Sequence, residues 1–166
     1  MNNMKKLLTL AFGLSTILAS AQAFTGKGDQ KLNIGANIQD GGTGIVAVYD
    51  YGLGENMSIG LYGTYMLGVH KAYDAANFED KIDVRARFNA NIGNVIGLPS
   101  QIDVYPGLNL GLKNFGGHVG ARYFFSDGFG VNTEFAFPIA TYDNHVVGYE
   151  HLNNQFQWNI GVSFNL

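Results

Sequence analysis

The sequence lacks cysteine altogether and has only three prolines among its 166 residues. Without cysteine, a disulfide scaffold is excluded. Scarce proline suits long β-strands, because proline removes a donor from the backbone ladder. Charge is sparse as well: 14% of residues are charged, and the formal net charge is −3. No basic cluster with interleaved aromatics stands outside the first residues, so nucleic acid is not an expected partner.

Long apolar runs are also missing, except near the N-terminus. Lys5 and Lys6 precede an apolar run over residues 7–19, which ends close to Ala21-Gln22-Ala23. This arrangement predicts a secretory signal peptide over residues 1–23 and one mature domain over residues 24–166. No later run approaches the roughly 20 apolar residues of a membrane helix. A mature chain inside a membrane therefore has to be a closed barrel, because lipid cannot satisfy an open sheet edge.

What the sequence has in plenty is two-residue alternation. In the last segment, 155–166, every second side chain is apolar, which places these side chains on one face of a strand. Eight such segments are found, at residues 31–39, 44–53, 57–67, 78–93, 101–113, 118–125, 130–140 and 155–166. Eight is even and is the smallest strand number of single-chain bacterial barrels.

The ionised side chains share one face of these segments with many glycines. A soluble barrel of the lipocalin or avidin type would be apolar inside and polar outside. Glycine on the charged face favours the inverse, because the interior of an eight-stranded barrel is only just wide enough for side chains. The predicted lumen charge network comprises Lys81, Asp83, Arg85, Arg87, Asp103, Lys113, Arg122 and Glu134. On the other face, the predicted membrane-interface aromatics are Tyr49, Tyr51, Tyr65, Tyr123 and Trp158.

Turn lengths predict orientation and pairing. With both termini in the periplasm, the longest connections, 68–77 and 141–154, lie on the outer side. A five-residue turn at 126–130 places Arg122 opposite Glu134 on neighbouring strands. A turn at 114–117 places Lys113 opposite His118, and Asn109 opposite Arg122.

Two prolines fall inside predicted strands. Because each removes a ladder hydrogen bond, Pro106 and Pro138 predict bulges or strand ends near a rim.

Residue patterns for catalysis, metals or cofactors are not evident. The four histidines lack the HxxxH and HExxH spacings of metal sites. An enzyme of the outer rim would draw on His70, Asp74, His145, Ser58 or Glu150, but the sequence does not assemble these into a nucleophile, a base and an orienting group. We expect no enzyme activity, no metal and no cofactor.

The last segment resembles the closing strand of bacterial outer-membrane barrels, whose terminal aromatic is read by the insertion machinery. Trp158, Ile160, Val162, Phe164 and Leu166 would form that assembly signal, with Leu166 in the place of the usual Phe. The mature chain resembles the small OmpA-type, OmpX-type and OmpW-type barrels. Its stretches 80–94, 105–131 and 153–166 look like an uncharacterised barrel family of Bacteroidota.

This resemblance implies an all-β, eight-stranded, antiparallel, transmembrane up-and-down barrel. It implies a monomer in the outer membrane of a Gram-negative bacterium, with membrane lipid and the barrel-insertion machinery as partners and scope for an unknown surface ligand. Two functions remain open. In the first, paired charges fill the lumen and the protein has a structural or surface-interaction role. In the second, the pairs rearrange and the barrel is a narrow, gated, porin-like pore for ions or small solutes.

Overall fold

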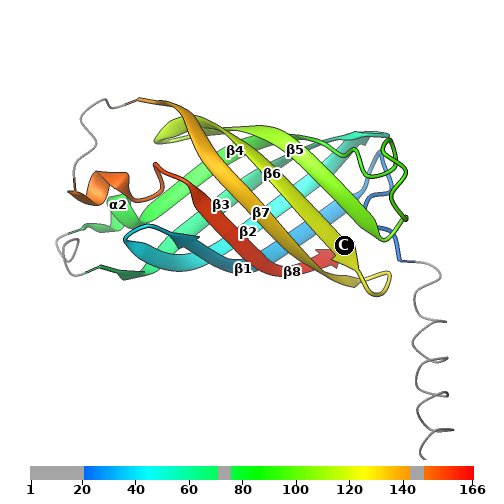
Figure 1. Ribbon diagram of the computed structural model, residues 1–166, viewed down its shortest axis with the longest axis horizontal. Coiled ribbons are helices and arrows are strands. Elements are labelled where there is room, and N and C mark those ends of the chain that lie inside the picture. Colours follow the sequence, from blue (N-terminus) through cyan, green and yellow to red (C-terminus); the bar gives the residue numbers. More distant parts are fainter. Residues whose placement is uncertain (1–20, 71–75, 143–147) are drawn as a thin grey trace, which may run out of the picture.

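A computed structural model describes residues 21–70, 76–142 and 148–166. Its strands form one closed barrel in which each strand pairs antiparallel with its sequence neighbours, and the last strand returns to the first (Figure 1). The strands are β1 Gln30–Gln39, β2 Gly42–Gly54, β3 Met57–Val69, β4 Ile82–Ala90, β5 Ile102–Gly111, β6 Asn114–Phe124, β7 Phe129–Thr141 and β8 Gln157–Asn165. The predicted eight-stranded antiparallel barrel is confirmed.

The connections divide between two ends of the barrel. The base end holds the C-terminus, the segment 21–29 before β1 and the connections 55–56, 91–101 and 125–128 (Figure 1). The loop end holds the connections 40–41, 70–81, 112–113 and 142–156. The first of these is a two-residue turn, in which Gly41 adopts a positive φ of 76°.

The strands turn apolar side chains outward and polar ones inward. Leu61 and Leu110 on the outer face are 61% and 59% exposed, whereas Arg122 on the inner face is 2% exposed. Apolar groups inside are confined to small clusters, such as Val46 and Val48 with Tyr62. The barrel is therefore inverted relative to a soluble one, and its interior is a packed polar core.

Among the described residues, two short helices lie at the loop end: α2, Phe78–Lys81, and the 3-10 helix η2, Gly148–His151. The prediction that the fourth strand starts at residue 78 is wrong. The carboxylate of Asp80 accepts a hydrogen bond from the Asn77 amide at 2.7 Å, and this contact at the helix N-terminus stabilises a helical turn. In the parts that the structure covers, no helix is long and apolar enough to cross a membrane.

The turn predicted at 114–117 is also wrong, because β6 already begins at Asn114 and the connection is only residues 112–113. Pro138 lies at a bulge near the loop end of β7, where the register against β6 shifts between Phe115 and Gly116. That part of the proline prediction is confirmed. For Pro106 the prediction is wrong, because this residue lies inside β5 and pairs in register with Val119 of β6. The register between β4 and β5 ends at Asn89 and Gly107, beside Pro106, where the missing amide donor is tolerated.

Candidate functional site in the barrel lumen

Glycines on the inner wall make room for long polar side chains. A Cβ atom at Gly120 would lie 2.2 Å from the ring of Tyr105, and one at Gly107 would lie 2.4 Å from Nε2 of His118. At Gly111 it would lie 2.8 Å from Cγ of Arg85. Such distances are far inside van der Waals contact, so these side chains can lie where they do only because the three positions lack a Cβ atom.

The ion pairs of Arg87 cross the lumen and join strands that are not neighbours. Arg87 on β4 contacts Glu134 on β7 through both terminal nitrogens, with Nη2 2.7 Å from Oε2. Its Nε lies 3.3 Å from Oδ1 of Asp50 on β2. One guanidinium therefore ties three separate strands together, in the two-point geometry that favours arginine over lysine.

Asn89 links this group to the neighbouring side chains. Its side-chain nitrogen donates to Asp50 Oδ1 at 3.0 Å and to Ser58 Oγ at 2.9 Å. Its oxygen accepts from Arg87 Nε and lies 2.7 Å from His118 Nε2. Because an amide oxygen can only accept, His118 carries its proton on Nε2, and its Nδ1 can accept from Asn109 at 3.2 Å.

Arg122 is held by charge and by an aromatic ring. Its guanidinium carbon lies 4.1 Å from the centre of the Tyr105 ring. Nη2 is 3.5 Å from Asp50 and Nε is 3.6 Å from Asp103, and among the described residues none of its nitrogens has a hydrogen-bond partner. Tyr105 also lies 5.7 Å from Arg87, so this ring sits between two cations in the middle of the lumen.

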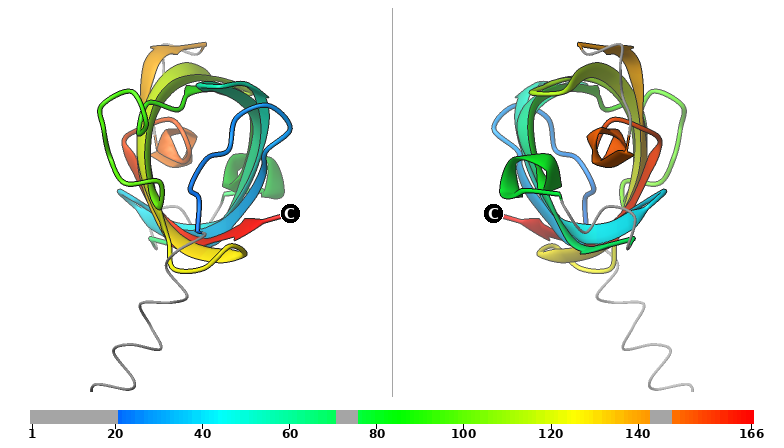
Figure 2. Two further views of the ribbon diagram at one scale, coloured as in Figure 1. Left: turned by 90° about the vertical axis from the view of Figure 1, so that its right-hand side faces the viewer. Right: turned by 90° about the vertical axis from the view of Figure 1, so that its left-hand side faces the viewer.

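The base end is closed by the chain that precedes β1 (Figure 2). Asp29 forms an ion pair with Lys31, whose ammonium lies 5.4 Å from the centre of the Phe124 ring. Ala21 and Ala23 pack with Phe124, and the Ala23 amide donates to the Ser100 carbonyl at 2.8 Å. Of the predicted signal peptide 1–23, only these last residues lie within the described part of the chain; residues 1–20 lie outside it.

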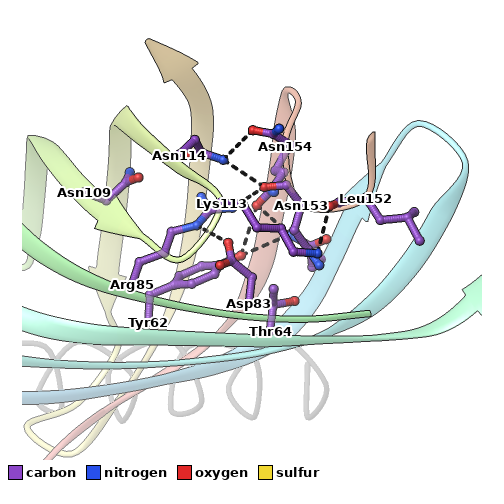
Figure 3. Close-up of polar contacts among 12 residues, drawn as sticks. Tyr62, Thr64, Asp83, Arg85, Asn109, Lys113, Asn114, Leu152, Asn153 and Asn154 are labelled. Atoms are coloured by element: carbon purple, nitrogen blue, oxygen red, sulfur yellow. Dashed lines mark hydrogen bonds and ion pairs between the residues drawn. The ribbon is translucent and has the colours of Figure 1, made fainter. Parts of the chain in front are cut away.

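The loop end is closed by residues 148–154, which we call the cap. In Figure 2 it lies within the mouth of the barrel, and Figure 3 shows its contacts with the wall. Leu152 and Asn153 are fully buried. The Asn153 carbonyl accepts from Arg85 Nη2 at 2.9 Å and from Asn114 Nδ2 at 3.1 Å. Its amide donates to Gln39 at 2.7 Å.

Asn153 itself adopts a left-handed φ of 64°, a conformation that asparagine tolerates better than most residues. Its side chain bonds both walls of the mouth: the nitrogen donates to the Lys81 carbonyl at 3.2 Å, and the oxygen accepts from Gln39 at 3.0 Å. Asn153 is therefore the central residue of the loop-end closure.

Lys113 fastens the cap to α2. Its ammonium donates to the Asp80 carbonyl at 2.6 Å and to the Leu152 carbonyl at 3.3 Å. Burial lowers the pKa of this amine, and the nearby Asp83 and Asp80 carboxylates oppose that effect. Asp83 in turn pairs with Arg85, with Nε 2.5 Å from Oδ2, and Arg85 lies 4.9 Å over the Tyr62 ring.

The structure places most of the predicted lumen residues together. Buried inside are Asp83, Arg85, Arg87, Asp103, Arg122 and Glu134. Lys113 lies at the loop-end rim, and Lys81 ends α2, half-exposed, with its carbonyl in contact with Asn153. Sequence reasoning missed Asp50, Lys31 and Asp29. Asp50 lies on the same inward strand face as Val46 and Val48, and because those valines make this face only partly polar, the predicted network omits Asp50.

The predicted charge pairing between neighbouring strands is wrong. Phe124 pairs with Gly130, so the residues between these partners, 125–129, lie one position earlier than the predicted turn at 126–130. Arg122 consequently lies opposite Asn132, and Glu134 lies opposite Gly120. Between β5 and β6, His118 lies opposite Gly107 rather than Lys113, and Arg122 lies opposite Asp103 rather than Asn109.

The residues considered for an enzyme are not gathered at one rim. Ser58 lies in the lumen towards the base end, where it donates to Asn91 at 2.9 Å, whereas His70 follows β3 at the loop end. Asp74 and His145 lie outside the described residues. Within the ranges described, no group of three or more His, Asp or Glu side chains could hold a metal ion.

The closing strand β8 completes the barrel between β1 and β7. On its outer face Trp158 donates to Thr133 at 2.8 Å, and the Phe164 ring lies 5.7 Å from that of Phe129. The amide of Leu166 donates to the Gln30 carbonyl at 3.1 Å, so pairing continues to the last residue.

Comparison with known proteins gives one family. DUF6646, a family of unknown function, matches residues 14–166. The chain belongs to this family. Among curated proteins no match is found. A solved structure of similar shape is the solution structure of outer membrane protein G from Pseudomonas aeruginosa. It is 11% identical, with a TM-score of 0.48 over 86% of this chain and 99% of that one.

Proposed function

We propose that this DUF6646 protein is an integral outer-membrane β-barrel whose lumen is permanently filled, with a structural or surface-interaction role in the envelope. The observation that carries the proposal is the inversion of the barrel. Large apolar side chains cover the outer face on all sides, and charged residues are buried within. A continuous apolar outer surface of this size is unstable in water and suits hydrocarbon.

Strand length supports the same proposal. The strands have between 9 and 13 residues, and a tilted membrane-spanning strand needs roughly 9–11. Aromatic rings gather on the outer face towards both ends. Phe125, Phe129 and Phe164 lie near the base, and Phe135 stacks on Trp158 towards the loop end. Such rings favour the two membrane–water interfaces.

The filled lumen supports a structural role over a conduit. Its charges are paired across the barrel, and the cap closes the loop end. The base end is covered by the segment before β1, in which the backbone of Gly28 and Asp29 bonds to that of Gly52 (Figure 2). A void beside Tyr105 and Glu134 measures about 10 Å³, which holds one water molecule at most. Charges that are paired in this way favour a fixed barrel shape over the passage of solute.

The remaining parts of the proposal concern export. The predicted signal peptide 1–23 would direct the chain through the inner membrane of a Gram-negative cell, and β8 would be read by the barrel-insertion machinery. The barrel is closed without help from a second chain, because β8 pairs with β1. We therefore propose that the barrel acts as a monomer. We also propose that the protein has no enzyme activity.

Fractionation of a producing Gram-negative cell tests location and barrel state together. The expected result is a protein in the outer-membrane fraction that resists alkaline extraction and migrates faster on a gel before boiling than after. Recovery in the soluble periplasmic fraction would contradict the proposal.

A second candidate function, the narrow gated pore, is favoured by one feature. The cap is a connection between β7 and β8 and not part of the wall, so it can move without breaking the barrel. If the Arg85–Asn153 and Lys113–Leu152 contacts opened, the polar lumen behind them would reach the loop-end solvent.

A further inference from the structure

Among the base-end connections, residues 91–101 are distinctive because they contain no charged residue. The other two connections at this end each carry a carboxylate, Glu55 in one and Asp127 in the other. Val95 and Ile96, at the tip of the uncharged connection, are 64% and 56% exposed. We call this connection the base loop.

The base loop is a fixed turn. The Ile96 amide donates to the Ile92 carbonyl at 3.1 Å, and the Leu98 amide donates to the Gly93 carbonyl at 2.9 Å. Gly97 supplies the positive φ, 75°, that ends this helical turn. Backbone groups are thus paired within the loop, which lets the two apolar side chains point outward without exposing unsatisfied amides.

The direction in which the base loop leaves the wall, and the row of aromatic rings beside it, indicate what the loop faces. Figure 2 shows it extending sideways from the wall instead of across the mouth of the barrel. Ile102, the first residue of β5, follows directly after the base loop and pairs with Tyr123 of β6. The Tyr123 ring packs edge-on against Phe125 at 4.9 Å, and this row of rings continues to Phe129. The loop therefore leaves the wall at the level where aromatic side chains mark the membrane–water boundary.

We propose that the base loop is a lateral membrane anchor, in which Val95 and Ile96 insert into the interfacial region of the adjacent lipid leaflet. This inference rests on the proposed membrane location of the barrel. An uncharged, hydrogen-bonded turn with an apolar tip is suited to the boundary between headgroups and acyl chains. The anchor sets the depth of the barrel in the bilayer on the side of β4 and β5.

Tryptophan fluorescence tests the anchor, because the chain contains a single Trp, Trp158 on the outer wall. Three proteins are reconstituted in phosphatidylcholine vesicles brominated either near the carbonyl or near the methyl end of the acyl chains. They are the unaltered protein, Trp158→Phe/Ile96→Trp, and the control Trp158→Phe/Glu55→Trp in the charged base turn. Faster migration before boiling verifies that each is folded.

The anchor predicts that Trp at position 96 emits at short wavelength and loses most of its intensity to bromine near the carbonyl end, while Trp at position 55 is quenched only by aqueous acrylamide. If Trp158 is quenched by brominated lipid and position 96 behaves like position 55, the anchor is wrong and the loop faces the aqueous phase, open to a protein partner. If Trp158 itself escapes brominated lipid, the membrane location is wrong, and the anchor with it.

Discussion

At the scale of single residues, several large lumen side chains, among them Tyr105, His118 and Arg85, occupy space that a glycine opposite or beside them leaves. Tyr105 can lie between Arg87 and Arg122 only because position 120 lacks a Cβ. This complementarity explains why glycine is frequent on a face that also holds the charges. The lumen is filled by buried side chains whose contacts are ion pairs and amide hydrogen bonds.

Gly120→Ala should destabilise the barrel, because its Cβ would lie 2.2 Å from the Tyr105 ring. Overpacking of this kind costs about 1–3 kcal/mol. The matched control is Gly63→Ala, since a Cβ there meets nothing within 4 Å and is expected to change stability by less than about 0.5 kcal/mol. Urea titration of the refolded proteins measures both, and equal losses at the two positions would refute the fit.

Glu134→Gln should destabilise the barrel by about 3 kcal/mol, because it removes one partner of a buried ion pair. The same titration applied to a double-mutant cycle with Arg87→Gln should show a coupling of about 1–3 kcal/mol. Arg122→Gln is the control partner, since Arg122 faces Asp50 and Asp103 instead. Coupling that is larger with Arg122 than with Arg87 would contradict the observed pairing.

The pair of Arg87 and Glu134 shows the limit of sequence reasoning at the scale of residues. Alternation has a local period, so it can assign Arg87 and Glu134 to the inner face. It cannot pair them, because their strands, β4 and β7, are not neighbours and meet only across the closed lumen. Neighbour pairs depend on turn lengths, and a displacement at 125–128 was enough to assign Glu134 the wrong arginine.

At the scale of elements, the two-residue alternation of the sequence predicts the strands, but it does not predict the segments that close the two ends of the barrel. The cap and the segment 21–29 have no periodic pattern, and their burial comes from contacts with distant strands. The short helix α2 carries a local signal, Asn77 three residues before Asp80, but the apolar period of β4 extends through it and masks the boundary.

The cap should shield Leu152 from solvent. In a Leu152→Cys variant, the introduced thiol should react much more slowly with a membrane-impermeant maleimide than that of a Tyr142→Cys control, because Leu152 is 0% and Tyr142 55% exposed. The chain has no other cysteine. Adding Arg85→Gln removes the bond to the Asn153 carbonyl and should speed labelling of position 152. Rapid labelling in the parent variant would mean that the cap does not occupy the mouth.

Deleting residues 164–166 should impair barrel assembly. The deletion removes the contact of Phe164 with Phe129 of β7 and the bond from Leu166 to Gln30 of β1, so β8 loses contacts with both neighbouring strands at the base. The fraction of protein that migrates faster before boiling measures assembly, with Asn165→Ser as a control that keeps the apolar face. An unchanged fraction after deletion would show that assembly does not need these residues.

At the scale of the whole molecule, the apolar exterior and the salt-bridged interior are the features that support the proposed membrane barrel with a filled, non-conducting lumen. Arg87 and Arg122 bind carboxylates from several strands, so the lumen acts as a single cross-link of the cylinder. Pore formation would require displacement of the cap and separation of these pairs, which costs several kcal/mol for each charge left unpaired.

Conductance across a planar bilayer tests this account most directly. The refolded protein is inserted, and its insertion is verified by protection from protease. The account predicts no discrete current from the unaltered protein, and openings when the cap contact is removed with Arg85→Gln and the central pair with Arg87→Gln. Steady openings of the unaltered protein would contradict the filled lumen and establish the gated pore instead.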